Sequence, residues 1–194
     1  METYSLFDIA RTGQIGPIRM GQTFDDFRSA AGAVIDFEKI YIEKFDHEGE
    51  ITAVDCRCYP FEFWFSWDWS HPDPKSNGIR LQFCDLGMPE KDGFEPYESD
   101  QRNEANQDFF DVVNFRIDFC GLYLNQSYED AQKILKGLKV ETIKDDTQDP
   151  DFRELVIRVE DHLVLWFGNY GGISNLVLNH PRIVFENSVA TRGL

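Results

Sequence analysis

The chain has 194 residues, of which 42% are hydrophobic and 14% aromatic, a composition typical of a folded protein with one sizeable core or two small ones. Nineteen basic residues against 35 acidic residues give a net charge of −16. This balance argues against sequence-independent binding to nucleic acid and against an anionic membrane as partner, because both need clustered Lys and Arg. The acidity favours a basic protein partner, and self-repulsion that keeps the chain soluble is the simpler alternative.

Residues 1–10 lack the basic stretch and apolar run of a signal peptide, and no run of about 18 apolar residues is present. We therefore expect a cytoplasmic protein without a membrane span. Its cysteines are then expected to be free thiols: Cys56, Cys58, Cys84 and Cys120. Since Cys56 and Cys58 have no second pair to complete a zinc site, neither a metal nor another cofactor is expected.

The first predicted helix begins within the segment Met20-Gly21-Gln22-Thr23-Phe24-Asp25-Asp26. Thr23 is a favourable N-cap residue, and the two aspartates after it complement the positive end of the helix dipole. Apolar residues continue at helical spacing until Gly32, where the helix is expected to end.

Four strands are predicted after this helix, over residues 40–45, 51–57, 61–69 and 78–83, with a hairpin turn at 46–50. The third strand reads FEFWFSWDW, and its alternate residues from Phe61 to Trp69 form a core face. Trp64 and Asp68 fall on the other face, and Trp69 stands at the strand end. An exposed Trp flanked by carboxylates is typical of a binding hot spot for a basic partner. Alternatively, Trp64 covers the neighbouring half of the chain.

The segment 85–111 is an acidic connector, with nine acidic residues against Lys91 and Arg102. Its glycines and prolines predict a loop, followed by a short helix near residues 103–110. Either this connector is merely solvated, or it contributes carboxylates to a partner site. The candidates for that site are Glu90, Asp92, Glu95, Glu98 and Asp100.

A second copy of the helix start occurs at residues 124–130, Leu124-Asn125-Gln126-Ser127-Tyr128-Glu129-Asp130. It matches residues 20–26 at every position except Gly21 and Asn125, the two residue types that best tolerate positive φ. Ser127 is the expected N-cap, and Gly137 the expected helix end. Strands are predicted again, over residues 139–143, 154–159, 162–167 and 173–178, with a turn at 169–172.

The repeat predicts an α+β fold of two tandem modules, each a short capped helix packed on an antiparallel sheet of about four strands. The modules are expected at residues 1–84 and 112–194, joined by the connector 85–111. Residues 6–9, before the first helix, are expected to match the strand-like segment 114–119 before the second. Whether the modules share one continuous sheet is left open by the pattern.

No catalytic motif accompanies this architecture: the sequence has no G-x-S-x-G elbow, no H-E-x-x-H and no Gly-rich phosphate loop. Asp68, His71 and Asp73 form the one cluster of metal-ligating residue types, which is explained by a proline-stiffened turn or, alternatively, by a cation site. We therefore expect no enzymatic activity, with a hydrolase of non-standard site as an alternative.

The stretch Ile15-Gly16-Pro17-Ile18-Arg19-Met20-Gly21-Gln22-Thr23 and the acids after it resemble the opening of small bacterial immunity proteins of toxin systems. The tandem modules also resemble the superfamily of the β-lactamase inhibitory protein and the outer-membrane assembly lipoprotein. That resemblance implies a sheet that presents aromatic and acidic residues to a protein partner. This chain departs from the superfamily in lacking an export signal and a lipobox cysteine, which agrees better with a cytoplasmic immunity protein.

The sequence thus predicts an immunity protein that binds and neutralises a basic toxin domain, such as a nuclease, through an acidic and aromatic surface. The alternative is a general interaction or scaffold module with no toxin partner. The oligomeric state and the identity of the toxin are not predicted.

Overall fold

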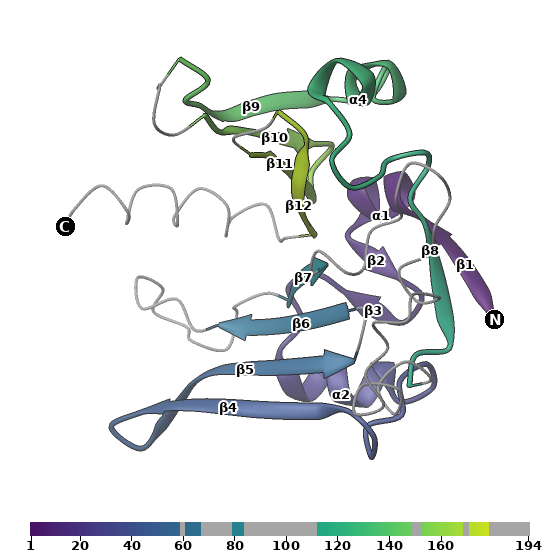
Figure 1. Cartoon of the computed structure of the whole chain (residues 1–194). Helices are drawn as coiled ribbons and strands as arrows, with labels where there is room; N and C mark the ends of the chain where they lie inside the picture. Colours follow the sequence, from purple (N-terminus) through teal and green to yellow (C-terminus); the bar gives the residue numbers. More distant parts are fainter. Residues whose placement is uncertain (59–60, 67–78, 84–111, 149–152, 169–170, 179–194) are drawn as a thin grey trace, which may run out of the picture.

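The computed structural model describes residues 1–58, 61–66, 79–83, 112–148, 153–168 and 171–178, which form an α+β fold (Figure 1). The helices in these residues are short: α1 (Leu6–Thr12), α2 (Phe24–Ala31) and α4 (Tyr128–Ile134). None of these helices is long and apolar enough to cross a membrane. The predicted connector 85–111 lies outside the described residues.

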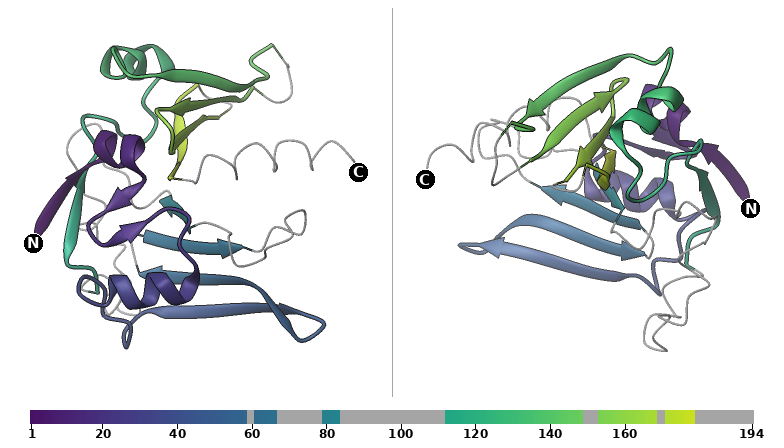
Figure 2. Two further views of the ribbon diagram at one scale, coloured as in Figure 1. Left: turned by 180° about the vertical axis from the view of Figure 1, so that it is seen from behind. Right: turned by 45° about the horizontal axis from the view of Figure 1, so that its top comes forward.

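One antiparallel sheet of eight strands dominates the fold, in the order β4-β5-β6-β7-β12-β11-β10-β9. Its strands are β4 (Tyr41–His47), β5 (Glu50–Cys58), β6 (Phe61–Ser66), β7 (Ile79–Phe83), β9 (Val140–Asp145), β10 (Leu155–Val159), β11 (Leu163–Phe167) and β12 (Ile173–Leu178). All eight lie where alternation in the sequence predicted strands. The pairing of β7 with β12 answers the open question, because it joins both groups of four strands into one sheet. Figure 2 shows β4 and β9 at opposite ends of this curved sheet.

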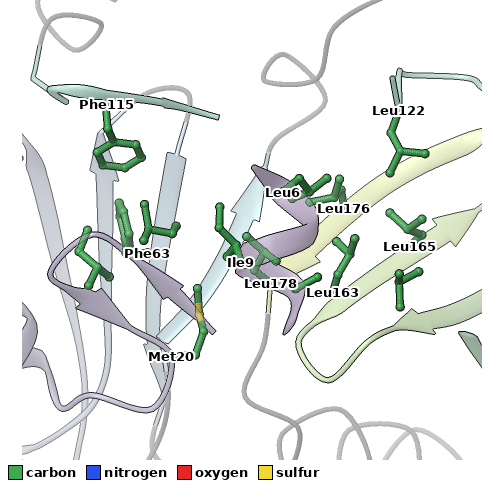
Figure 3. Close-up of a cluster of buried hydrophobic side chains, with 14 of the residues drawn as sticks. Leu6, Ile9, Met20, Phe63, Phe115, Leu122, Leu163, Leu165, Leu176 and Leu178 are labelled. Atoms are coloured by element: carbon green, nitrogen blue, oxygen red, sulfur yellow. The ribbon is translucent and has the colours of Figure 1, made fainter. Parts of the chain in front are cut away.

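The three helices pack on one face of the sheet. The ring of Phe27 in α2 lies 4.8 Å from that of Phe63 and 5.0 Å from that of Phe65, both in β6. In α4, the ring of Tyr128 packs edge-on against that of Phe167 in β11, with 5.2 Å between the ring centres. Figure 3 shows α1 among leucines of β11 and β12, with Phe115 directed toward Phe63. These contacts form one core that is shared by both halves of the chain.

Both predicted N-caps are confirmed. The side-chain oxygens of Thr23 and Ser127 each accept a hydrogen bond of 3.2 Å from the N–H three residues on. Gly21 and Asn125 both have positive φ, 89° and 62°, as the pairing of these two residue types indicated. Each cap stabilises its helix by about 1 kcal/mol. The predicted helix end at Gly137 is wrong, since α4 ends at Ile134 with Leu135 as its C-cap.

The expected match between residues 6–9 and 114–119 is also wrong, because Leu6 opens helix α1 whereas β8 (Phe115–Asp118) is a strand. Leu6, Ile9 and Ala10 are buried at helical spacing, and Gly13 ends the helix with a φ of 65°. The strand that accompanies β8 is instead β1 (Glu2–Ser5), which pairs with it in parallel. A short hairpin of β2 (Gln14–Ile15) and β3 (Ile18–Arg19) follows α1.

The N-terminal segment is tied to the second half of the chain by backbone contacts. Besides the pairing of β1 with β8, the carbonyl of Ala10 accepts a hydrogen bond of 2.9 Å from the N–H of His162, in the turn between β10 and β11. Ile35 forms an isolated bridge with Val113. The two halves therefore do not pack as separate units.

The predicted turn between β4 and β5 is confirmed. Glu48 and Gly49 both have positive φ, 55° and 85°, which is the geometry of a two-residue type I′ hairpin turn. This turn joins β4 and β5 in an antiparallel hairpin at one end of the sheet, with a shift of register between Phe45 and Asp46.

Candidate protein-binding face

The sheet has a second face, turned away from the helices, which we call the outer face. Phe63 and Phe65 are buried toward the helices, and because side chains alternate along a strand, Trp64 occupies an outer-face position between them. One row of outer-face residues crosses all eight strands as successive pairing partners. This row is Tyr41, Arg57, Glu62, Gln82, Val177, Val164, Arg158 and Glu141.

The two halves of the outer face are related in register. Arg57 of β5 and Arg158 of β10 occupy corresponding places in the row, on either side of the pairing of β7 with β12. Trp64 lies opposite Asp55 and Arg80, and Trp166 of β11 lies opposite Val156 and Asn175. This correspondence was not predicted, although the similarity of FEFWF (61–65) to LVLWF (163–167) is a signal of it in the sequence.

Several outer-face residues, in β5 and in β10 to β12, are buried. Val164 and Val177 are fully buried, as is the carboxylate-bearing Asp55, and Arg158 is almost so. Trp166 packs partly buried against Val156 and Val164. These residues therefore stabilise the fold and are not available as a contact surface.

Among the residues whose burial is described, exposed aromatic and apolar side chains of the outer face gather at its rim, on the hairpin of β4 and β5. Of the five large hydrophobic side chains that are exposed in the described part of the chain, Tyr41, Phe45 and Ile51 belong to this hairpin. Tyr41, Glu43 and Phe45 alternate along β4 and so share the outer face. Exposed aromatic residues beside carboxylates are the usual composition of a site for a basic protein partner.

Arg57 shows the chemistry available at this rim. Its Nε–H donates to Oδ2 of Asp55 over 2.7 Å, and its Nη2 lies 3.9 Å from Oε2 of Glu43. Its guanidinium carbon stands 5.7 Å from the centre of the Tyr41 ring. Two carboxylates and an aromatic ring thus surround one guanidinium, the combination that recognises Arg in general.

Of the predicted partner-binding residues, only Trp64 lies within the described residues. The outer-face position of Trp64 in β6 agrees with the predicted polar face, whereas the contacts of its side chain are not described. The remaining candidates lie outside the described residues: Asp68, Trp69, Glu90, Asp92, Glu95, Glu98 and Asp100. The alternative cluster of Asp68, His71 and Asp73 also lies outside them. The exposed Tyr41 and Phe45 were not predicted, although their alternation with Glu43 was readable in the sequence.

Cys56 and Cys120 are free thiols. Burial is the main cause that raises the pKa of the Cys56 thiol to about 12, and the neighbouring Asp55 carboxylate adds to it. Cys56 therefore stays protonated at neutral pH. In the described part of the chain, no three metal-ligating side chains come together.

Comparisons with protein-family models, with curated proteins and with solved structures each find no match for this chain. The resemblance to immunity proteins therefore stays a hypothesis, and the residues of the outer face are the basis on which a function can be proposed.

Proposed function

We propose that this chain is an immunity protein that binds a basic bacterial toxin domain, such as a nuclease, and blocks its active site. One observation carries the proposal: the exposed rings of Tyr41 and Phe45 alternate with the carboxylate of Glu43 at the rim of the outer face. Aromatic rings among carboxylates suit a partner rich in Lys and Arg, and a net charge of −16 steers such a partner toward the chain.

Trp64 extends this proposed surface. It shares the outer face with the rim, one strand away from Asp55, and a Trp in such a position is a frequent hot spot of protein interfaces. Asp68, Trp69 and the acidic residues of the connector 85–111 complete the surface as we propose it. The proposed surface would therefore consist of aromatic residues with acidic residues around them.

We further propose that residues 1–84 and 112–194 are diverged copies of one module, and that the protein acts in the cytoplasm. The equivalent N-cap hydrogen bonds of Thr23 and Ser127 support the proposal that the two segments are diverged copies. The corresponding register of the two tryptophans, Trp64 and Trp166, supports it as well.

The test is a titration of the purified chain with the toxin encoded by the gene immediately upstream. We expect nanomolar association and stoichiometric loss of toxin activity. Association should weaken by about tenfold or more as ionic strength rises from about 0.05 to 0.5 M, because attraction between exposed charges is screened by salt. Absence of salt-sensitive binding would refute the proposal, and a genome neighbourhood without a toxin gene would favour a general interaction module.

A further inference from the structure

β4 is an edge strand of the eight-stranded sheet, and it pairs along one side with β5. Among the strands that the structure describes, none pairs with the other side of β4. Figure 1 shows β4 as the outermost strand, in a hairpin that extends past the end of β6. A strand in this position presents backbone N–H and C=O groups to which a further strand can pair.

The side chains of β4 suit an added strand. Tyr41 is 46% and Phe45 36% exposed, and Glu43 lies between them on the same face. In the interior of a sheet, such residues are covered by cross-strand neighbours on both sides, with aromatic residues beside apolar ones and carboxylates beside Lys or Arg. On β4, the described strand pairing supplies such cross-strand neighbours from β5, on one side of the strand.

The opposite edge, β9, has a different character. Its sequence VETIKD contains no aromatic residue. Glu141 lies 3.6 Å from Arg158, and Lys144 pairs with both Asp146 and Glu154. Both edges carry an ion pair with the neighbouring strand, since Glu43 of β4 also lies 3.9 Å from Arg57. The exposed aromatic rings of Tyr41 and Phe45 distinguish β4, and they make it the better edge for a partner.

The charge around β4 defines the chemistry of that partner. Residues 41–50 carry four acidic residues, Glu43, Asp46, Glu48 and Glu50, against Lys44. A second copy of the chain, also at −16, would be repelled. Resting on the proposed function, we propose that β4 accepts a ninth strand from an extended segment of the partner in which basic and apolar residues alternate.

In this arrangement the backbone hydrogen bonds of the added strand supply affinity, and the alternate side chains supply selectivity. Basic side chains on one face of the added strand would lie beside Glu43, between the exposed rings of Tyr41 and Phe45. An acidic or uncharged strand would form the same backbone bonds and lack this attraction.

The probe is a synthetic peptide of ten residues in which Lys alternates with Val, blocked at both ends, and the readout is amide hydrogen exchange of the full chain. At about 1 mM peptide and low salt, we expect exchange in residues 41–47 to slow by about fivefold or more, and exchange in residues 140–145 to stay unchanged. Absence of protection in β4, or equal protection of β9, would overturn the proposal.

Two further peptides carry N-methyl groups, one on every Lys and the other on every Val. Both keep the side chains, and each lacks the backbone N–H donors along one edge of the added strand. One of the two should bind about tenfold more weakly. Equal binding of both would show docking of side chains without strand addition, and would contradict the proposal. Glu43→Gln should weaken binding of the unmodified peptide by about threefold, and its matched control on the other edge, Glu141→Gln, should not.

The same exchange measurement on the complex with the toxin separates this inference from the proposed function. If the toxin is neutralised while β4 stays unprotected, the proposed function stands and the strand addition is wrong. If the peptide protects β4 and no toxin is neutralised, the inference about the edge stands and the proposed function fails.

Discussion

The Nε–H of Arg57 donates to Oδ2 of Asp55 over 2.7 Å, joining a half-exposed guanidinium to a fully buried carboxylate. Arg57→Ala removes a charged donor from a carboxylate that water cannot reach, so we expect a loss of about 1–3 kcal/mol in the free energy of unfolding. Urea denaturation measures it. Lys39→Ala is the control, because the pair of Lys39 with Asp36 is exposed on both sides and should be worth less than about 0.5 kcal/mol. Equal effects of the two variants would show that burial of Asp55 does not set the strength of its pair with Arg57.

The helix caps allow a second prediction. Thr23→Ala and Ser127→Ala each remove the acceptor of an N–H at a helix start, and each should cost about 1 kcal/mol in the free energy of unfolding. Ser29→Ala, at an exposed position in the last turn of α2, replaces a hydroxyl that is not the N-cap, and should be neutral or slightly stabilising because Ala favours helix. If Ser29→Ala cost as much as Thr23→Ala, capping would not be the reason for the effect.

These caps were predictable from the sequence because capping is a local matter, decided within four residues. The eight strands were predictable for the same reason, since alternation is visible along each strand. Helix α1 was missed because it spans only two turns and its apolar residues, Leu6, Phe7 and Ile9, also suit a strand. The pairing of β7 with β12 leaves no local pattern, so the continuity of the sheet could not be read in advance.

The candidate site was predictable only in part. The alternation around Trp64 predicted its face in the sheet, whereas nothing in the local pattern indicates the complete burial of the charged residue Asp55. The exposure of Tyr41 and Phe45 follows from the place of β4 at the sheet edge, and strand order decides that place. Composition supplied the acidic character of the surface, and topology was needed to locate its rim.

At Gly172 an added side chain would collide with backbone atoms. A Cβ there would lie 2.7 Å from the carbonyl oxygen of Asn125 and 2.8 Å from its Cα, and Asn125 is held by a hydrogen bond to Ile173. Because backbone must shift to relieve this contact, Gly172→Ala should destabilise by about 2–4 kcal/mol in chemical denaturation. At Gly49, with open space and a φ of 85°, the same substitution should cost only about 1 kcal/mol. A smaller loss at Gly172 than at Gly49 would refute the close approach.

The Cys56 thiol predicts a dependence of stability on alkaline pH. Its pKa is raised from 9.0 to about 12 in the folded chain, so between these values the folded state keeps a proton that the unfolded state releases. The contribution of Cys56 to stability is therefore complete below pH 9 and is lost as the pH rises toward 12. Cys56→Ala should flatten the fall in unfolding free energy between about pH 9 and 11, measured against the wild type. An unchanged slope would show that Cys56 does not carry this dependence.

The two tryptophans at corresponding register positions should respond differently to truncation. Trp166 packs against Val156 and Val164, so Trp166→Ala should destabilise the fold by about 3 kcal/mol and leave toxin affinity unchanged in the molecules that remain folded. Under the proposed function, Trp64→Ala should instead weaken toxin binding by about 30-fold or more, as truncation of an interface hot spot does. Calorimetric titration at a temperature where both variants are folded separates the two effects. If Trp64→Ala lowered stability alone, Trp64 would belong to the cover of the sheet, and the binding surface would have to be sought at the β4 rim.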